Sequence, residues 1–201
     1  MTAPSRSRVD VFVDPVCPFA WIAYRWLLEV AEQRELDLHL RMMSLAVLND
    51  EHPEHPERGL ESAWRPVRVG AAMVEQTDER AWAQFVVAFG TRYHVRGERT
   101  RDDVLRATLA DLGAEDLYAA ADSTARDDEI RRRHDEGMGP VGLDVGTPVL
   151  HVDGTAFFGP VLEAVPHGQE ALDAFDGALL LARNPHFVEL KRTRSGNIDP
   201  S

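Results

Sequence analysis

Cys17 is the only cysteine of this 201-residue chain, and its position suggests chemistry. It follows an alternating apolar segment, Arg8 to Asp14, that predicts a buried strand, and it precedes a helical pattern that begins at Pro18. Unpaired amides and the partial positive charge at a helix start favour a thiolate, and catalytic thiols in such positions have pKa values lowered from ~8.5 to roughly 3.5–7.5. We therefore expect a reactive thiol with a lowered pKa. The alternative is a small buried hydrophobic residue.

A second feature with chemical meaning is Gly146-Thr147-Pro148, which stands directly before a predicted strand. An X-Pro bond can be cis, and a cis bond at a fixed position is usually kept for a reason. We expect the Thr147–Pro148 bond to be cis, whereas the alternative is a trans proline that opens a strand.

The elements around these residues occur in the order βαβ, a long helical stretch, then ββα. This order is that of an α/β thioredoxin-like fold with a helical insertion. We expect residues 1–48 and 145–201 to form the thioredoxin-like core and residues 49–144 the insertion. The remaining predicted elements are a helix from Pro18 to about Glu35, a strand Leu36–Met42, a loop Asn49–Arg58, helices between about Glu61 and Met138, strands Pro148–Val152 and Thr155–Phe158 around the hairpin turn Asp153-Gly154, and a helix Gln169–Arg183.

Composition narrows the function classes. The net charge of −12 argues against nucleic acid or an anionic membrane as a partner, and no run of about 18 apolar residues predicts a membrane span. A single cysteine excludes an internal disulfide and fits the cytoplasm, where we expect the protein to stay. Lys191 is the only lysine among 22 basic residues, which is typical of the GC-rich genomes of actinomycetes. The oligomeric state is left open, a homodimer being one option.

Six short motifs, spread over most of the chain, carry a resemblance to a known family. They are D-P-V-C-P-F-A-W (Asp14 to Trp21), M-S-L-A-V-L-N (Met43 to Asn49), W-R-P-V-R-V (Trp64 to Val69), V-G-T-P-V-L-H-V-D-G (Val145 to Gly154), F-F-G-P-V-L (Phe157 to Leu162) and P-H-F-V-E-L-K-R-T-R (Pro185 to Arg194). From about Val9 to Arg194 the chain resembles the cytosolic DsbA-like family of thioredoxin-fold proteins, and in particular the mycothiol-dependent nitroreductases of actinobacteria. This resemblance implies that the cis proline lies against Cys17 and that the preceding residue pairs with a bound thiol substrate.

The chain departs from the family at one position. The family pattern is C-P-W-C or C-P-F-C, and Ala20 stands where the second cysteine belongs. That position lies one turn along the same helix face, from which a resolving thiol attacks a mixed disulfide. The sequence leaves open whether Ala20 is natural or replaces a cysteine, but it excludes a dithiol–disulfide cycle within this chain.

The resemblance implies a thiol-dependent oxidoreductase in which Cys17 reduces nitroaromatic or disulfide-type substrates. Mycothiol or another low-molecular-weight thiol is the expected co-substrate, and a second thiol molecule replaces the missing cysteine. Two alternatives are a glutathione-transferase-like isomerase or conjugating enzyme of the same superfamily, and a non-catalytic thiol-binding or chaperone protein.

Four more residues are candidates for binding the substrate or the thiol, together with Thr147 and Pro148. Pro18 suits the first turn of the helix, while Phe19 and Trp21 flank the thiol and can form an apolar wall. Packing of Trp21 in the core is the alternative. His94 matches a family position and is a candidate to bind or protonate a substrate, or is a structural histidine.

Three other polar residues receive no role. Asp14 would raise the pKa of Cys17 if it were close, or else it caps the turn. His52 and His55 resemble a metal tract, but two prolines break any shared helix face, so a solvated loop is the better interpretation and no metal is expected.

Overall fold

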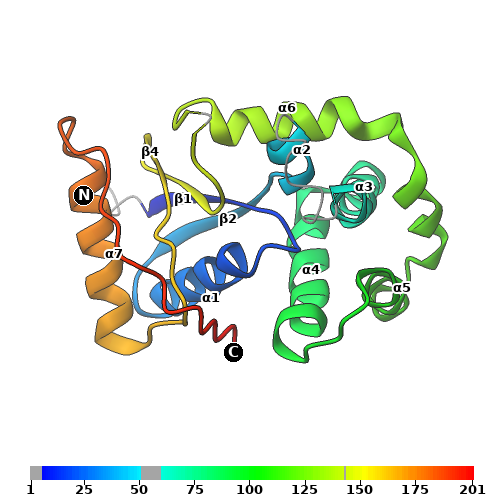
Figure 1. The fold of residues 1–201 in the computed structure, drawn as a ribbon, viewed down its shortest axis with the longest axis horizontal. Helices are drawn as coiled ribbons and strands as arrows, with labels where there is room; N and C mark the ends of the chain where they lie inside the picture. The colour runs from blue at the N-terminus through cyan, green and yellow to red at the C-terminus, as the bar shows by residue number, and fades with distance from the viewer. Residues whose placement is uncertain (1–5, 51–59, 143) are drawn as a thin grey trace.

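A four-stranded sheet is the centre of the computed structural model, which describes residues 6–50, 60–142 and 144–201. The strand order is β2-β1-β3-β4, with β1 (Ser7–Val13) parallel to β2 (Leu36–Met42) and antiparallel to β3 (Val149–Val152). β3 pairs antiparallel with β4 (Thr155–Phe158). Helices α1 (Pro18–Gln33) and α7 (Gly168–Ala182) follow the first and last strands, which completes βαβ plus ββα. The predicted thioredoxin-like fold is confirmed, and Figure 1 shows its arrangement.

The alternating pattern that predicted β1 has a direct structural cause. Val9, Val11 and Val13 are at most 1% exposed, because β1 is a central strand with neighbours on both edges. The hairpin between β3 and β4 forms as its sequence predicts. Asp153 and Gly154 have φ values of 48° and 85°, the left-handed pair that a two-residue turn of this kind requires.

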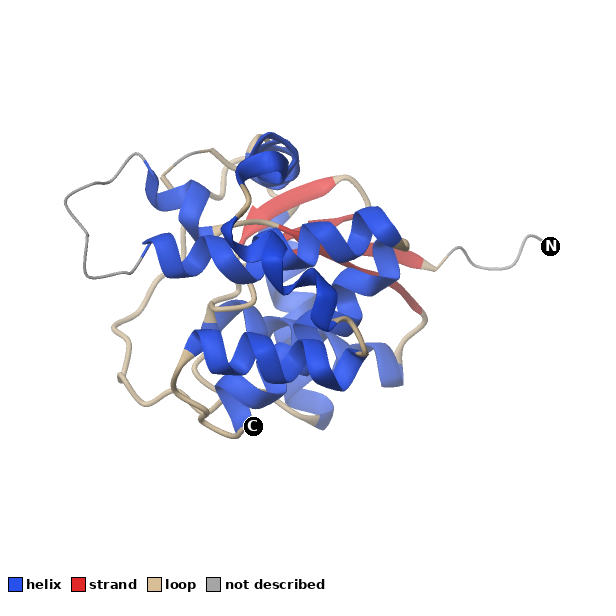
Figure 2. Ribbon diagram, turned by 90° about the vertical axis from the view of Figure 1, so that its right-hand side faces the viewer, coloured by secondary structure: helices blue, strands red, loops and turns tan. Residues whose placement is uncertain are grey.

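The long helical stretch between β2 and β3 packs beside the sheet (Figures 1 and 2). Its elements are α2 (Leu45–Asp50), α3 (Leu60–Gln76), α4 (Glu79–Gly90), the π-helix η2 (Thr91–Val95), α5 (Arg101–Leu112), the 3₁₀ helices η3 (Glu115–Asp122) and η4 (Thr124–Arg126), and α6 (Asp127–Met138). None of the helices in the described part of the chain is long and apolar enough to cross a membrane. The division into a core of 1–48 and 145–201 and an insertion of 49–144 stays a prediction.

One local prediction was wrong. A loop was expected from Asn49, but Asn49 and Asp50 lie in α2, whose first turn is capped by the Ser44 hydroxyl accepting from the Val47 amide at 3.3 Å. The rest of the predicted loop lies outside the described residues.

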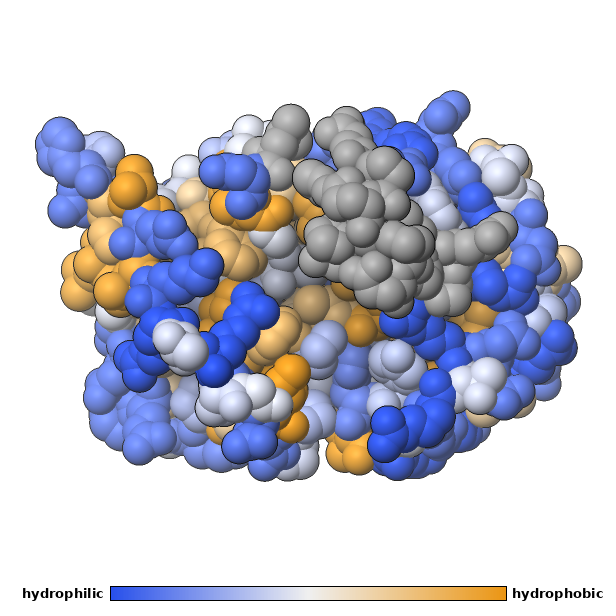
Figure 3. Space-filling model, viewed as in Figure 1, coloured by the Kyte–Doolittle hydropathy of each residue, from blue (hydrophilic) through white to orange (hydrophobic). Residues whose placement is uncertain are grey.

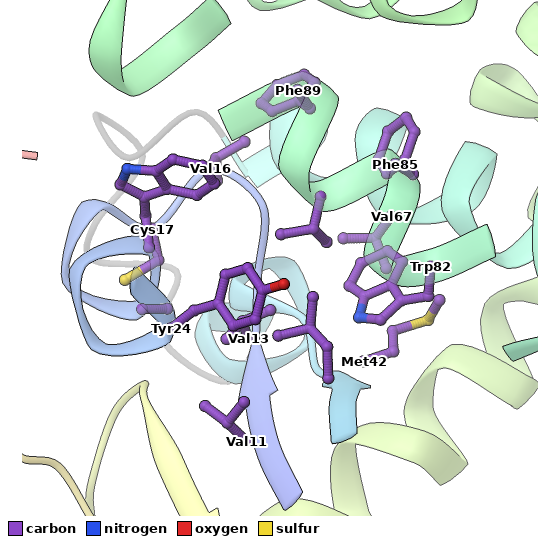
Figure 4. Packing of buried hydrophobic residues seen from close by; sticks show 14 of the residues in the cluster. Val11, Val13, Val16, Cys17, Tyr24, Met42, Val67, Trp82, Phe85 and Phe89 are labelled. Atoms are coloured by element: carbon purple, nitrogen blue, oxygen red, sulfur yellow. The ribbon is translucent and has the colours of Figure 1, made fainter. Parts of the chain in front are cut away.

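One apolar cluster joins the sheet to the helical stretch. Figure 4 shows Cys17 at one side of this cluster, which continues through Val13 and Met42 to Trp82 and Phe85 of α4. Because the cluster is continuous, both the sheet and the helices of the middle stretch pack against the turn that carries Cys17.

Candidate functional site

The turn between β1 and α1 carries Cys17, at the end of the sheet where β3 begins. The Cys17 amide donates to the Asp14 carbonyl at 3.1 Å, and Cys17 is the N-cap residue of α1 with Pro18 in the first turn. The Thr147–Pro148 bond is cis, as predicted. The Cys17 thiol donates to the Thr147 carbonyl with Sγ and O 3.9 Å apart, so the two sequence features meet in space.

The thiol is buried in this arrangement, and the predicted lowering of its pKa is wrong. Cys17 is 5% exposed, and burial raises its pKa to about 12. Hydrogen bonds from the amides of Ala20 and Phe19 favour the thiolate, as expected at a helix start, but the loss of solvation outweighs them and the charge of Asp14 adds to it. As long as its sulfur is buried in this way, Cys17 is therefore a protonated thiol.

Asp14 clamps the turn that carries Cys17. Its carboxylate accepts from the Val16 amide at 2.8 Å and from the Leu45 amide, at the start of α2, at 2.7 Å. Asp14 is 1% exposed, and burial raises its pKa to about 6 against the opposing effects of these bonds and of Arg101. The clamp joins the ends of β1 and β2, a role that sequence reasoning left open. The Asp-Pro pair at the end of a strand is a sequence signal that could have indicated this cap.

The burial of Asp14 predicts a distinct pH dependence of stability. Its pKa rises from 3.8 to about 6 on folding, so this carboxyl stabilises the folded state when it is protonated. The contribution, about 3 kcal/mol in full, is present below about pH 4 and is lost as the pH rises through about 6. Relative to Asp14→Asn, which cannot ionise, the unmodified chain is expected to lose this stability between pH 4 and 7 in urea unfolding.

A matched control for this experiment is Asp116→Asn, which changes an exposed carboxyl in the first turn of η3. Its difference from the unmodified chain should vary little over the same pH range. A flat difference for Asp14→Asn as well would contradict the raised pKa of the buried Asp14 carboxyl.

Trp21 lies beneath the surface next to the thiol and is 3% exposed. Its indole Nε1 donates to the carbonyl of Pro200, near the chain end, at 2.9 Å. On its other side the His94 ring stacks on it with 5.8 Å between centroids. Trp21 is therefore packed between Pro200 and His94. This agrees with the alternative interpretation, core packing, and not with an open apolar wall for a ligand.

His94 comes from the π-helix η2 and reaches the same turn. Its Nε2 lies 2.9 Å from the Pro15 carbonyl, and since a carbonyl only accepts, Nε2 carries the proton. Burial lowers the pKa of His94 to about 4, so the ring is neutral at pH 7 with Nδ1 unprotonated. In this form His94 holds the Cys17 turn and has no proton to give as an imidazolium.

The structure thus brings the seven predicted residues together at one end of the sheet. Pro18 and Phe19 are half-buried in the first turn of α1, whereas Thr147 and Pro148 are buried. His52 and His55 lie outside the described residues. Sequence reasoning missed the chain end as part of the site, because no local pattern in an irregular segment indicates what it packs against.

The model of the family described as Rv2466c-like, mycothiol-dependent nitroreductase Rv2466c, matches residues 16–192. An uncharacterized protein of Mycobacterium tuberculosis, Rv2286c, is 33% identical over 194 residues, which are 94% of this chain and 83% of that protein.

Two solved structures share the fold. A 2-hydroxychromene-2-carboxylate isomerase has a TM-score of 0.56 at 15% identity, with 86% of this chain and 94% of that chain covered. The cytosolic disulfide reductase DsbM from Pseudomonas aeruginosa, solved with GSH, has a TM-score of 0.51 at 15% identity, with 87% and 100% covered. At this identity the likeness concerns the fold alone.

Proposed function

This chain belongs to the Rv2466c-like family of mycothiol-dependent nitroreductases and is a thioredoxin-fold oxidoreductase, and from that premise we propose that Cys17 works with a low-molecular-weight thiol as reductant. Mycothiol is the first choice for that thiol, and the cytoplasm is the proposed compartment. The observation that carries the proposal is the position of the Cys17 thiol. It lies among the first amides of α1 and 3.9 Å from the carbonyl that precedes the cis proline.

The proposed chemistry is a series of disulfide exchanges. The Cys17 thiolate attacks one sulfur of a disulfide substrate, forms a mixed disulfide and releases the other half of the substrate as a thiolate. A molecule of the low-molecular-weight thiol then attacks the mixed disulfide, which restores the Cys17 thiolate and joins this thiol to the remaining half of the substrate. A second molecule of the thiol exchanges with that product, releases the remaining half as a thiol and leaves the disulfide of the low-molecular-weight thiol in solution. Two thiols are thereby oxidised to one disulfide, and their two electrons and two protons reduce the substrate; a nitro group takes up the same two electrons and two protons on becoming a nitroso group and water.

The first step requires that Cys17 be uncovered. Burial is the largest cause of its raised pKa, so contact with solvent removes the main barrier to ionisation. The bonds from the amides of Phe19 and Ala20 come from α1 itself, and we expect them to remain when the residues packed around the sulfur move away. The uncovered thiol is then the activated thiol that a helix start predicts.

The neighbouring residues have proposed supporting roles. Phe19 supplies apolar surface beside the sulfur, and Trp21 supplies more once the Pro200 carbonyl leaves its indole. Pro18 fixes the start of the helix that supplies the amides. Thr147 offers its backbone to the bound thiol next to Pro148. His94 acts as a positioning residue through its bond to the Pro15 carbonyl.

Ala20 supports a second candidate, an isomerase or conjugating enzyme that adds a thiol to an electrophile. Such an enzyme needs no resolving thiol, and Ala20 is fully buried with no other cysteine in the chain. The products separate the two candidates, because an oxidoreductase consumes two thiols per disulfide and a conjugating enzyme forms a thioether.

Turnover is the direct test of the proposal. With mycothiol and a nitroaromatic or disulfide substrate, the chain is expected to form mycothiol disulfide together with reduced product, measured by chromatography. Cys17→Ser should lose this turnover, since its hydroxyl forms no disulfide. Thioether products would favour the second candidate, and binding without turnover would indicate a thiol-binding protein.

A further inference from the structure

The last residues of the chain return to the thiol. After α7 ends at Ala182, residues 184–201 run back beside α7 and finish next to α1 (Figure 1). Residues 188–199 are exposed, and the structure gives them no helix or strand beyond one isolated bridge between Ala164 and Asp199. Figure 3 shows hydrophilic residues along this course next to apolar residues over α7.

Glu163 is the main anchor of this segment. Its carboxylate accepts from the amides of Ser195 at 3.1 Å and Gly196 at 3.0 Å. Its backbone carbonyl accepts from the Asp199 amide at 2.7 Å. Residues 195–199 are therefore tied to a single point between β4 and α7.

The segment then contacts both residues that flank Cys17 in the first turn of α1. The Arg194 guanidinium stands over the Phe19 ring, 4.7 Å from its centroid, and the Pro200 carbonyl accepts from the Trp21 indole. Arg194 is also close enough for its charge to lower the pKa of Cys17, although by less than burial raises it. Residues 194–200 are a strap across the turn that holds the thiol.

We propose that this strap selects the substrates of Cys17: it admits small thiols and disulfides and excludes disulfides carried by a polypeptide. The inference rests on the proposed function, in which Cys17 exchanges with disulfides. A polypeptide binds this kind of site as an extended strand beside the residue that precedes the cis proline. Such a strand needs room on both sides of the sulfur, and here Thr147 is only 6% exposed while the strap lies over Phe19 and Trp21.

A small disulfide needs much less room. The strap is held by a few exposed hydrogen bonds and has little regular structure, which are the properties of segments that open locally at low cost. A brief opening admits a small molecule to the sulfur. A polypeptide needs the strap to stay away from the first turn of α1 for longer, which requires that its anchoring contacts be lost.

Two variants and one control test the proposal. The first ends the chain at Arg194, which keeps the guanidinium and removes the contacts of residues 195–201. The second, Glu163→Ala, keeps every residue of the strap and removes the carboxylate that accepts from Ser195 and Gly196. The control, Glu170→Ala, removes an exposed carboxylate in the first turn of α7.

The measurement is the rate constant of mixed-disulfide formation at Cys17, followed by intact mass. The probes are oxidised glutathione and an extended peptide with one glutathionylated central cysteine. We expect the ratio of peptide rate to small-disulfide rate to rise about tenfold in the shortened chain, and in the same direction in Glu163→Ala, but not in the control. Circular dichroism checks folding, and if the shortened chain is unfolded Glu163→Ala decides alone.

The remaining outcomes overturn one claim or the other. An unchanged ratio with normal reaction of oxidised glutathione contradicts the strap as a selector, and so does an equal rise for both probes. If oxidised glutathione and oxidised mycothiol modify neither the full chain nor the variants, the proposed disulfide exchange itself is wrong.

Discussion

Oxidised mycothiol is expected to leave one stable adduct on each chain, at Cys17. The first exchange forms the mixed disulfide, and in a C-x-x-C enzyme a thiol one helical turn away clears it quickly because the reaction is intramolecular. Ala20 occupies that position and carries no nucleophile, so clearance waits for a second thiol from solution. Intact-mass measurement after removal of free thiols, followed by digestion to locate the modified peptide, detects the adduct.

Ala20→Cys should reverse this result. Position 20 lies on the same face of α1 as Cys17, and the side chain there is fully buried beside it. The variant is expected to show little adduct and an internal disulfide, seen as a mass loss of two hydrogens relative to the reduced chain.

Ala23→Cys is the matched control for this pair. Ala23 is also fully buried in α1, but it lies a further turn along the helix, out of reach of the Cys17 sulfur. Its adduct should persist as in the unmodified chain. If the chain and Ala20→Cys both stay unmodified, Cys17 is not a disulfide-exchange nucleophile and the isomerase candidate moves ahead.

Local patterns were sufficient for the framework that positions Cys17. The alternation in β1, the helical spacing after Pro18 and the turn at Asp153-Gly154 each depend on neighbours in sequence, and each is found where it was predicted. The cis bond before Pro148 was also predicted, because the fold brings that residue to the active end of the sheet.

The protonation state of the Cys17 thiol could not be predicted from such local patterns. A helix start predicts a lowered pKa, but the raised pKa of Cys17 comes from burial, which depends on what the rest of the chain packs around it. The contacts of Arg194 and Pro200 with the first turn of α1 link residues more than 170 positions apart. An irregular chain end has no periodicity from which such a contact can be inferred.

His94 shows the same limit in a different way. Its position in the sequence indicated a residue near the thiol, and it does lie there, stacked on Trp21. Its role could not be inferred, because the bond to the Pro15 carbonyl exists only when the π-helix η2 turns the ring toward the loop. A histidine at this position could also serve as a general acid. Its burial and its hydrogen-bond partner decide between the two roles.

Gly90→Ala is expected to destabilise the folded chain strongly, because the added methyl group would collide with Trp21. Gly90 ends α4 with φ −63° and ψ −37°, a conformation that alanine adopts freely, so the effect is one of space. A Cβ there would lie 2.4 Å from both Cε3 and Cζ3 of Trp21, inside the contact distance of two carbons. Either α4 or the indole must move.

The indole has little freedom to move. Its N–H is bonded to the Pro200 carbonyl, and the His94 ring is stacked on it. Displacing it therefore breaks contacts with both the chain end and η2, and adds to the usual cost of overpacking, 1–3 kcal/mol. We expect Gly90→Ala to lower the free energy of unfolding by about 3 kcal/mol and to shift the NMR signal of the Trp21 indole N–H.

Gly177→Ala separates this clash from the general effect of replacing a helical glycine. Gly177 lies inside α7 with open space where its Cβ would stand, so alanine there should stabilise the chain by about 0.5–1 kcal/mol. Urea unfolding of both variants gives opposite signs if Gly90 is the point at which α4 closes on Trp21. A stabilised Gly90→Ala variant would show that α4 and α1 leave room for a Cβ at position 90, in contrast to its 2.4 Å distance from the Trp21 ring. It would also show that the Trp21 ring can shift, and so can adjust its position beside Cys17.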